Sequence, residues 1–101
     1  CNREITMQLR KTEIFREWLA HLRDHRARSF IVQRLTRIQD GLLGDCHSIG
    51  NNVSELRIHY GPGYRIYFTR KGDEIILLLC GGDKSSQTAD IERAKTLASE
   101  V

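Results

Sequence analysis

The spacing of apolar residues predicts two consecutive helices in the first half of the chain. Thr12 has a side chain suited to a helix N-cap, and Asp24 suits the same position at the start of a second helix. Gly41 and Gly44 follow the second pattern and predict its end. The apolar positions, at three- and four-residue spacing, are Ile14, Phe15, Trp18, Leu19 and Leu22 in the first stripe and Ala27, Phe30, Ile31, Leu35, Ile38 and Leu42 in the second. We expect these helices to form a hairpin that packs on a sheet.

Alternation of apolar and polar residues predicts the strands of that sheet. The expected strands are Ile5–Leu9, 55–60, 64–69 and 74–80. Turns are predicted at Gly61-Pro62-Gly63 and at Arg70–Asp73. The last strand is apolar on both faces, which indicates a position inside the sheet rather than at its edge. The segment Asp45–Asn52 has the composition of a loop.

A C-terminal helix is predicted after the last strand. Ser85 and Ser86 are expected to cap it, and its apolar stripe is Ile91, Ala94, Leu97, Ala98 and Val101. The order strand, helix, helix, three antiparallel strands, helix predicts an α+β fold, with the helices packed on one face of a small, antiparallel-rich sheet. With 101 residues, no repeat and no linker, residues 1–101 are predicted to form a single domain.

Composition places the chain among soluble globular proteins. Apolar residues make up 40% and charged residues 29% of the sequence, a balance that supports a packed core. The longest apolar run, Ile75–Cys80, is too short to cross a bilayer, so we expect a cytoplasmic protein without a membrane partner. The net charge of +3 is compatible with nucleic acid or with an acidic protein partner and identifies neither.

Cysteines and histidines indicate neither a disulfide framework nor a metal site. Cys1, Cys46 and Cys80 are odd in number and form no Cys-x-x-Cys pair. His21 and His25 stand four residues apart on the first predicted helix, but no third ligand accompanies them, so surface positions are expected. We therefore predict that the protein uses no metal and no cofactor.

Polar residues that face away from the predicted core carry the candidate chemistry. On the two middle strands these residues are Arg57, His59, Arg65 and Tyr67, which are expected to share one exposed sheet face. Two guanidinium groups can clamp a phosphate, and Tyr67 can stack on a base or donate through its hydroxyl. His59 can exchange a proton near neutral pH, whereas Lys84 suits an electrostatic stabiliser better than a general base.

Such a set of side chains fits a metal-free ribonuclease. In that chemistry the RNA 2′-hydroxyl is the nucleophile, cations stabilise the crowded phosphorane, and side chains exchange protons. The same residues fit the solvated side of a half-buried sheet equally well. The pattern alone leaves both interpretations open.

Three blocks of sequence resemble a known family of toxins. They are ELRI at 55–58, YGPGYRIYF at 60–68 and LLCGGDKS at 78–85. Together with the order of elements, they look like the RelE/ParE toxin superfamily and, more narrowly, its HigB-like addiction module killer branch. The resemblance implies a RelE/ParE-like fold and a toxin held inactive by a cognate antitoxin, a small helix-turn-helix protein that joins it in a hetero-oligomer.

Members of this superfamily commonly cleave messenger RNA without a metal, often on the ribosome, so the resemblance implies an endoribonuclease acting on translated messages. The implied site residues are Arg57, Arg65, Tyr67 and Lys84, to which the chemistry of the side chains adds His59. The implied RNA-binding residues on the helical surface are Arg23, Arg26 and Arg34, which suit an acidic antitoxin segment equally well. Two alternatives stay open: a ParE-like inhibitor of DNA gyrase without catalysis, and a detoxified module that only binds its antitoxin.

Overall fold

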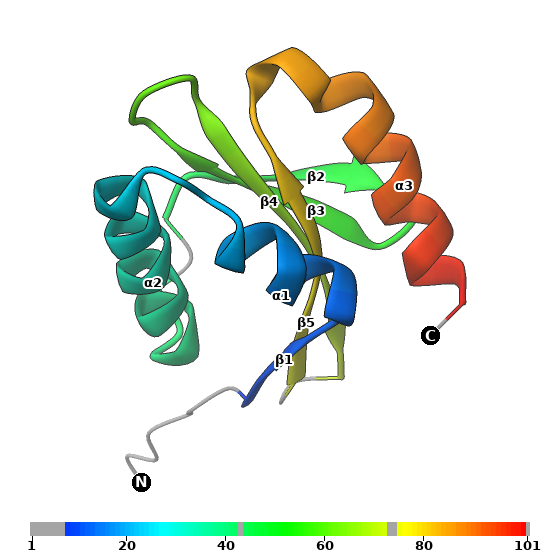
Figure 1. Cartoon of the computed structure of the whole chain (residues 1–101). Coiled ribbons are helices and arrows are strands. Elements are labelled where there is room, and N and C mark those ends of the chain that lie inside the picture. Colours follow the sequence, from blue (N-terminus) through cyan, green and yellow to red (C-terminus); the bar gives the residue numbers. More distant parts are fainter. Residues whose placement is uncertain (1–7, 43, 73–74, 101) are drawn as a thin grey trace, which may run out of the picture.

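A five-stranded sheet forms the centre of the molecule (Figure 1). The computed structural model describes residues 8–42, 44–72 and 75–100. The elements are β1 (Gln8–Lys11), α1 (Glu13–Ala20), α2 (His25–Gln39), β2 (Cys46–Gly50), β3 (Val53–Ile58), β4 (Tyr64–Lys71), β5 (Ile75–Gly82), a 3₁₀ turn (Lys84–Ser86) and α3 (Gln87–Ser99). The strand order is β1-β5-β4-β3-β2, with β1 parallel to β5 and the other neighbours antiparallel. The predicted α+β class is confirmed, and β5 lies inside the sheet as expected.

Both predicted N-caps of the helix hairpin are confirmed. Thr12 Oγ1 accepts a hydrogen bond from the Phe15 amide at 3.1 Å and donates one to the Leu79 carbonyl at 2.6 Å, so the cap also ties α1 to β5. Asp24 accepts from the amides of Arg26 and Ala27 at 3.0 and 3.2 Å. No helix in the described part of the chain has the length and apolar character to cross a membrane.

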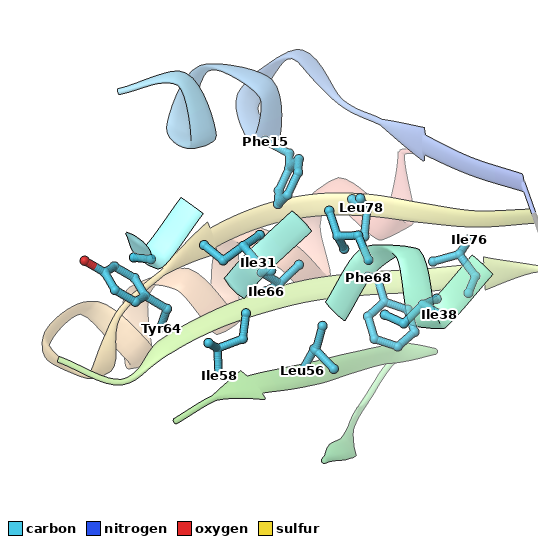
Figure 2. Close-up of a cluster of buried hydrophobic side chains, with 12 residues drawn as sticks. Phe15, Ile31, Ile38, Leu56, Ile58, Tyr64, Ile66, Phe68, Ile76 and Leu78 are labelled. Atoms are coloured by element: carbon cyan, nitrogen blue, oxygen red, sulfur yellow. The ribbon is translucent and has the colours of Figure 1, made fainter. Parts of the chain in front are cut away.

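The apolar stripes of α1 and α2 close over one face of the sheet (Figure 2). Phe15, Ile31 and Ile38 are fully buried there against Ile66 and Leu78. Each such aliphatic or aromatic side chain contributes about 1.5–3 kcal/mol when it is removed from water. The core positions of this face are Phe15, Ala27, Ile31, Leu35, Ile38, Leu56, Ile58, Tyr64, Ile66, Phe68, Ile76 and Leu78. The predicted second stripe is correct in four places, whereas its members Phe30 and Leu42 are 37% and 62% exposed.

The C-terminal helix packs on the opposite face, so the prediction that all helices share one face is wrong. Ala94 of α3 is buried against Val53, Tyr67, Leu79 and Cys80, a cluster separate from the one under α1 and α2. In Figure 1, α2 and α3 flank the sheet from its two sides. The expected alternation along the strands is real. Residues of both phases are buried, because one phase faces the helix hairpin and the other faces α3. Among the described residues of the second phase on β3, just after it and at the start of β4, only Arg57, His59 and Arg65 keep contact with solvent.

The segment predicted as a loop at 45–52 contains a strand. Cys46–Gly50 forms β2, which pairs antiparallel with β3 at the edge of the sheet. The connection runs through Asn51 and Asn52, whose φ values of +54° and +64° suit a primed hairpin turn. Asparagine tolerates this left-handed backbone better than most residues. The Asn-Asn pair was therefore the turn signal that the composition-based interpretation missed.

Two consecutive glycines at the end of β5 let helices approach both faces of the strand. A Cβ atom on Gly81 would lie 2.5 Å from ring carbons of Trp18 in α1. A Cβ on Gly82 would collide with the Asp90 carboxylate of α3 and lie 2.9 Å from Ser86 Oγ. Because successive residues of a strand point to opposite faces, the pair admits one helix on each side.

Several elements begin or end at other residues than predicted: β3 spans Val53–Ile58 rather than 55–60, β4 extends to Lys71 rather than Thr69, and β5 extends to Gly82 rather than Cys80. The first strand, predicted at Ile5–Leu9, lies partly outside the described residues, within which β1 begins at Gln8. Ser86 occupies the N-cap of α3 but makes no capping hydrogen bond with its side chain. Asp83 instead caps the preceding 3₁₀ turn, where its carboxylate accepts from the Ser85 amide at 2.9 Å. Val101, predicted for the stripe of this helix, lies outside the described residues.

Gly81→Ala is expected to destabilise the protein by about 1–3 kcal/mol, because the new methyl group must displace the Trp18 ring. Urea unfolding monitored by circular dichroism measures this loss. In a Trp18→Leu background the same substitution should be milder, since the smaller side chain leaves room. Equal losses in the two backgrounds would contradict the contact between Trp18 and Gly81.

Cys80 is expected to resist alkylation in the folded protein. Its side chain is buried, and that burial raises the pKa of the thiol to about 12, so about one molecule in ten thousand carries a thiolate at pH 8. Cys46 is only half-buried and should react with iodoacetamide at least tenfold faster, as read by peptide mass spectrometry. In urea, where the fold is lost, Cys80 and Cys46 should be alkylated at similar rates. Equal rates under native conditions would show that α3 does not cover this face.

Candidate functional site

The candidate site lies on the α3 side of the sheet, where side chains from neighbouring strands form two rows. In the first row Arg57 of β3 stands opposite Arg65 of β4, which in turn stands opposite Gly82 of β5. In the second row Glu55 stands opposite Tyr67. Directly opposed residues of an antiparallel pair have close Cβ atoms, so the two predicted arginines are brought together as like charges. Such a pair requires negative charge nearby.

Arg57 obtains that charge from Glu55, two residues back along the same strand. The Glu55 carboxylate is 1% exposed and accepts from Arg57 Nε at 3.1 Å, Tyr67 Oη at 3.2 Å and Gln87 Nε2 at 3.0 Å. A buried carboxylate is tolerated only when donors of this kind surround it. Glu55 thereby joins β3, β4 and the first residue of α3. The sequence interpretation gave it no role; a glutamate in phase with two arginines on a strand was the available signal.

Arg65 lacks such compensation. Its Nε and Nη1 atoms are buried, and among the residues that the structure describes neither has a hydrogen-bond partner. Buried polar groups are nearly always paired, and unpaired guanidinium nitrogens in a cationic setting favour an anionic ligand. The side chain of Arg57 next to it is 38% exposed and Arg65 is half-buried, so part of the pair reaches solvent.

Tyr67 is placed beside the arginines as predicted, but the expectation that it is exposed is wrong. The residue is fully buried beneath α3, and its hydroxyl donates to Glu55. Burial, followed by the charge of Glu55, raises the pKa of the phenol far above its ordinary value. A ring in this position cannot stack on a base, and its hydroxyl stays protonated. Tyr67 holds the Glu55 carboxylate in place instead.

His59 lies at the far side of Arg57 from Arg65, in a cluster around Asp45. The Arg57 amide donates to the Asp45 carbonyl at 3.0 Å, which places Asp45 beside Arg57 on β2's side of the sheet. The Asp45 carboxylate accepts from Nε2 of His59 and, at 2.9 Å, from Nε2 of His47. The hydrogen bond from His59 holds the pKa of Asp45 below its usual range. His59 itself remains 72% exposed and available to solvent.

Lys84 is exposed at the start of the 3₁₀ turn that leads into α3. A Cβ on Gly63 would lie 3.8 Å from Lys84 Cβ, so the lysine borders the turn between β3 and β4. Arg65 follows two residues after Gly63 on β4. The structure thus brings the backbone of Lys84 to the same end of the sheet as the paired arginines.

The three arginines predicted for the helical surface do not share one environment. Arg23, between the helices, and Arg26, in the first turn of α2, are exposed. Arg34 is half-buried, and its Nη1 donates to the Arg57 carbonyl at 2.8 Å, so it supports β3 as well as contributing charge.

The two histidines placed on one helix by the sequence interpretation lie in different elements. His21 is the C-cap of α1, whereas His25 is the first residue of α2. Both are exposed, as expected. Within the described ranges, no group of three or more histidine, cysteine or acidic side chains is arranged to hold a metal ion.

The comparisons with known proteins define the family and the fold. A family model described as phage derived protein Gp49-like (DUF891) matches residues 17–100, and the chain belongs to that family. An uncharacterized protein of Haemophilus influenzae is 43% identical over 97 residues, which cover 96% of this chain and 98% of that protein. The name of this relative states no activity. The class of fold is shown by similarity to solved structures.

Two solved toxin structures share the fold. The toxin–antitoxin complex RelBE2 of Mycobacterium tuberculosis contains a chain that matches with a TM-score of 0.64 and 12% identity, covering 84% of this chain and 99% of that one. A double arginine-to-alanine mutant of the E. coli toxin RelE in the free state matches with a TM-score of 0.69 and 12% identity, covering 88% and 98%. The Gp49-like chain therefore has the RelE toxin fold.

Glu55→Ala is expected to lower the free energy of unfolding by about 2–4 kcal/mol, because three donors lose their common acceptor and Arg57 loses its carboxylate partner beside Arg65. Tyr67→Phe removes one of the three hydrogen bonds and should cost about 1 kcal/mol. Urea unfolding followed by Trp18 fluorescence measures both. If Glu55→Ala were no worse than Tyr67→Phe, the carboxylate would not be the common anchor of these elements.

Proposed function

We propose that this protein is the toxin of a toxin–antitoxin pair and that it cleaves messenger RNA without a metal ion. The class of toxin is supported by the RelE fold, shared with a toxin known in the free state and with a toxin bound to its antitoxin. The reaction is supported by the paired arginines. The HigB-like branch, first indicated by the sequence blocks, is part of the same proposal.

The observation that carries the proposal is the half-buried guanidinium of Arg65, with two buried nitrogens lacking partners among the described residues. A phosphate of RNA presents oxygens that match such a fork. Arg57 stands directly opposite, so the two side chains can hold one phosphate between them. Both would bind the extra negative charge of the phosphorane more strongly than the ground-state phosphate.

The bond changes follow from the chemistry of RNA. The 2′-oxygen attacks the neighbouring phosphorus and loses its proton, the bond from phosphorus to the 5′-oxygen breaks, and that oxygen gains a proton. This leaves a cyclic phosphate and a free 5′-hydroxyl. The imidazole of His59 can take or give a proton in this step, and its hydrogen bond to Asp45 orients the ring. Lys84 adds positive charge at the same end of the sheet. Tyr67 acts through Glu55 as a positioning residue for Arg57.

The surroundings of the site suggest its partners. Exposed Arg23 and Arg26 are suited to contacts with ribosomal RNA, which would place cleavage on translated messages in the cytoplasm. An antitoxin that covers Arg57 and Arg65 in a hetero-oligomer would block the proposed site.

Arg65→Ala is expected to lower RNA cleavage by about 100-fold or more while leaving the fold intact, because it removes a charge that has no protein partner among the described residues. Arg65→Lys should remain impaired, since an ammonium group cannot form the paired hydrogen bonds. Arg10→Ala, on the exposed surface of β1, is the matched control for loss of charge. Primer extension of abundant transcripts after brief induction without antitoxin measures cleavage, and circular dichroism checks the fold.

Discrete new 5′ ends within translated regions, lost in Arg65→Ala and retained in Arg10→Ala, are the expected result. Growth arrest with unbroken transcripts would contradict RNA cleavage and indicate inhibition of DNA gyrase, which a supercoiling assay would then detect. Growth without arrest would indicate a module that only binds its antitoxin.

A further inference from the structure

A second cationic surface lies on the other side of β3, between α2 and the end of that strand. It is a groove of about 380 Å³ lined by Phe30, Gln33, Arg34, Arg37, Ile58, His59 and Tyr60. The lining residues from α2 are spaced three and four apart, so they form one stripe beside the buried stripe of the helix. This groove, here called the α2 groove, contains none of the proposed catalytic residues except His59.

The floor of the α2 groove is aromatic. The rings of Phe30 and Tyr60 have centroids 4.9 Å apart and are tilted by 58°. Phe30 is 37% exposed, although it lies within the apolar pattern of α2. Phe30 therefore offers an accessible aromatic face, while Tyr60 beside it is half-buried and packs against the core.

The lining of the α2 groove is cationic, and the carboxylates of Asp45 and Asp24 adjoin it at His59 and Tyr60. The sequence of α2, HRARSFIVQRLTRIQ, holds four arginines and no acidic residue. None of the residues lining the groove carries a carboxylate. Arg37 forms no ion pair with any carboxylate in the described ranges. Aromatic rings flanked by arginines are the usual means of binding single-stranded nucleic acid.

The α2 groove also adjoins the site on the sheet. Arg34, which lines the groove, donates to the carbonyl of Arg57 at 2.8 Å. His59 lines the groove and also belongs to the Asp45 cluster next to Arg57. A strand of RNA whose phosphate rests on Arg57 and Arg65 thus has the groove beside it, around the end of β3.

We propose that the α2 groove binds single-stranded RNA, with a base lying against the Phe30–Tyr60 pair and a phosphate on Arg37. This inference rests on the proposed function, since it assigns the groove to a segment of the same substrate next to the cleaved bond. An acidic peptide would also satisfy the arginines. The adjacency to Arg57 and the shared His59 favour the substrate strand over a separate protein ligand.

Binding is tested with a fluorescein-labelled 2′-O-methyl oligoribonucleotide, which keeps bases and phosphates but lacks the nucleophile. Phe30→Ala is expected to weaken binding about 5- to 100-fold by fluorescence anisotropy, because a stacking surface is lost. Phe30→Leu should weaken it nearly as much, whereas Phe30→Tyr should retain it. Arg37→Ala should reduce the log–log dependence of affinity on salt by about 0.7.

The controls are Val32→Ala, which removes an exposed apolar side chain elsewhere on α2, and Arg10→Ala on β1. Both should bind as the unaltered protein does, and thermal unfolding verifies that each variant is folded. Binding by Phe30→Ala equal to that by Val32→Ala would overturn the proposal. So would failure of the unaltered protein to bind the oligonucleotide.

Two further outcomes separate this inference from the proposed function. If Phe30→Ala cut transcripts normally and bound RNA with unchanged affinity, the proposed role of the α2 groove would be wrong. The proposed cleavage of messenger RNA would still stand. RNA binding that depends on Phe30, in a protein that cuts no transcript, would support the groove and overturn the enzymatic function. If Phe30→Ala lost only its affinity for a fluorescent peptide of alternating glutamate and leucine, the groove would be a protein-docking surface and the proposal would be wrong.

Discussion

The buried carboxylate of Glu55 is the contact on which the α3 side of the molecule depends. It accepts hydrogen bonds from two strands and from the first residue of α3. Because a carboxylate away from water must be surrounded by donors, the positions of Arg57, Tyr67 and Gln87 are coupled to one another through it. The contact also distinguishes two neighbouring arginines: Arg57 has a carboxylate, and Arg65 has none among the described residues. That difference makes Arg65 the stronger candidate for holding an anion.

The sheet is covered by helices on both faces. The sheet face that the sequence predicted to be exposed is therefore partly covered by α3, and the candidate site is limited to the part that α3 leaves open. α3 lies over Tyr67 and Glu55, while the ends of β3 and β4 nearer to Arg57 and His59 stay accessible. Gly81 and Gly82 make the double coverage possible, because a side chain at either position would strike Trp18 on one face or Asp90 on the other. The two glycines of the Gly-Gly-Asp-Lys-Ser block thus allow helices to pack closely on both faces of β5. The same block places Lys84 at the edge of the site.

Local signals in the sequence were reliable where one residue and its near neighbours decide the structure. Thr12 and Asp24 cap their helices because a side-chain oxygen needs only the amides that follow it. Four positions of the α2 stripe are buried because helical periodicity alone sets which side chains share a face. The strand β2 was missed because its five residues have weak periodicity and its turn signal, Asn51-Asn52, lies at one end.

By itself the sequence determined the α+β class, the order of the elements apart from β2, the caps of both helices in the hairpin, the glycine turn at 61–63, and the placement of Arg57 and Arg65 on one face of neighbouring strands. All of these follow from contacts between residues close in the chain or from the two-residue period of a strand. Only the tertiary structure decided which face α3 covers. That choice buried Tyr67 and brought Gln87 to Glu55 as its third donor. The packing of α2 on the opposite face left Phe30 outside the core. These outcomes depend on long-range packing of amphipathic faces, and a side chain such as tyrosine is compatible with either environment.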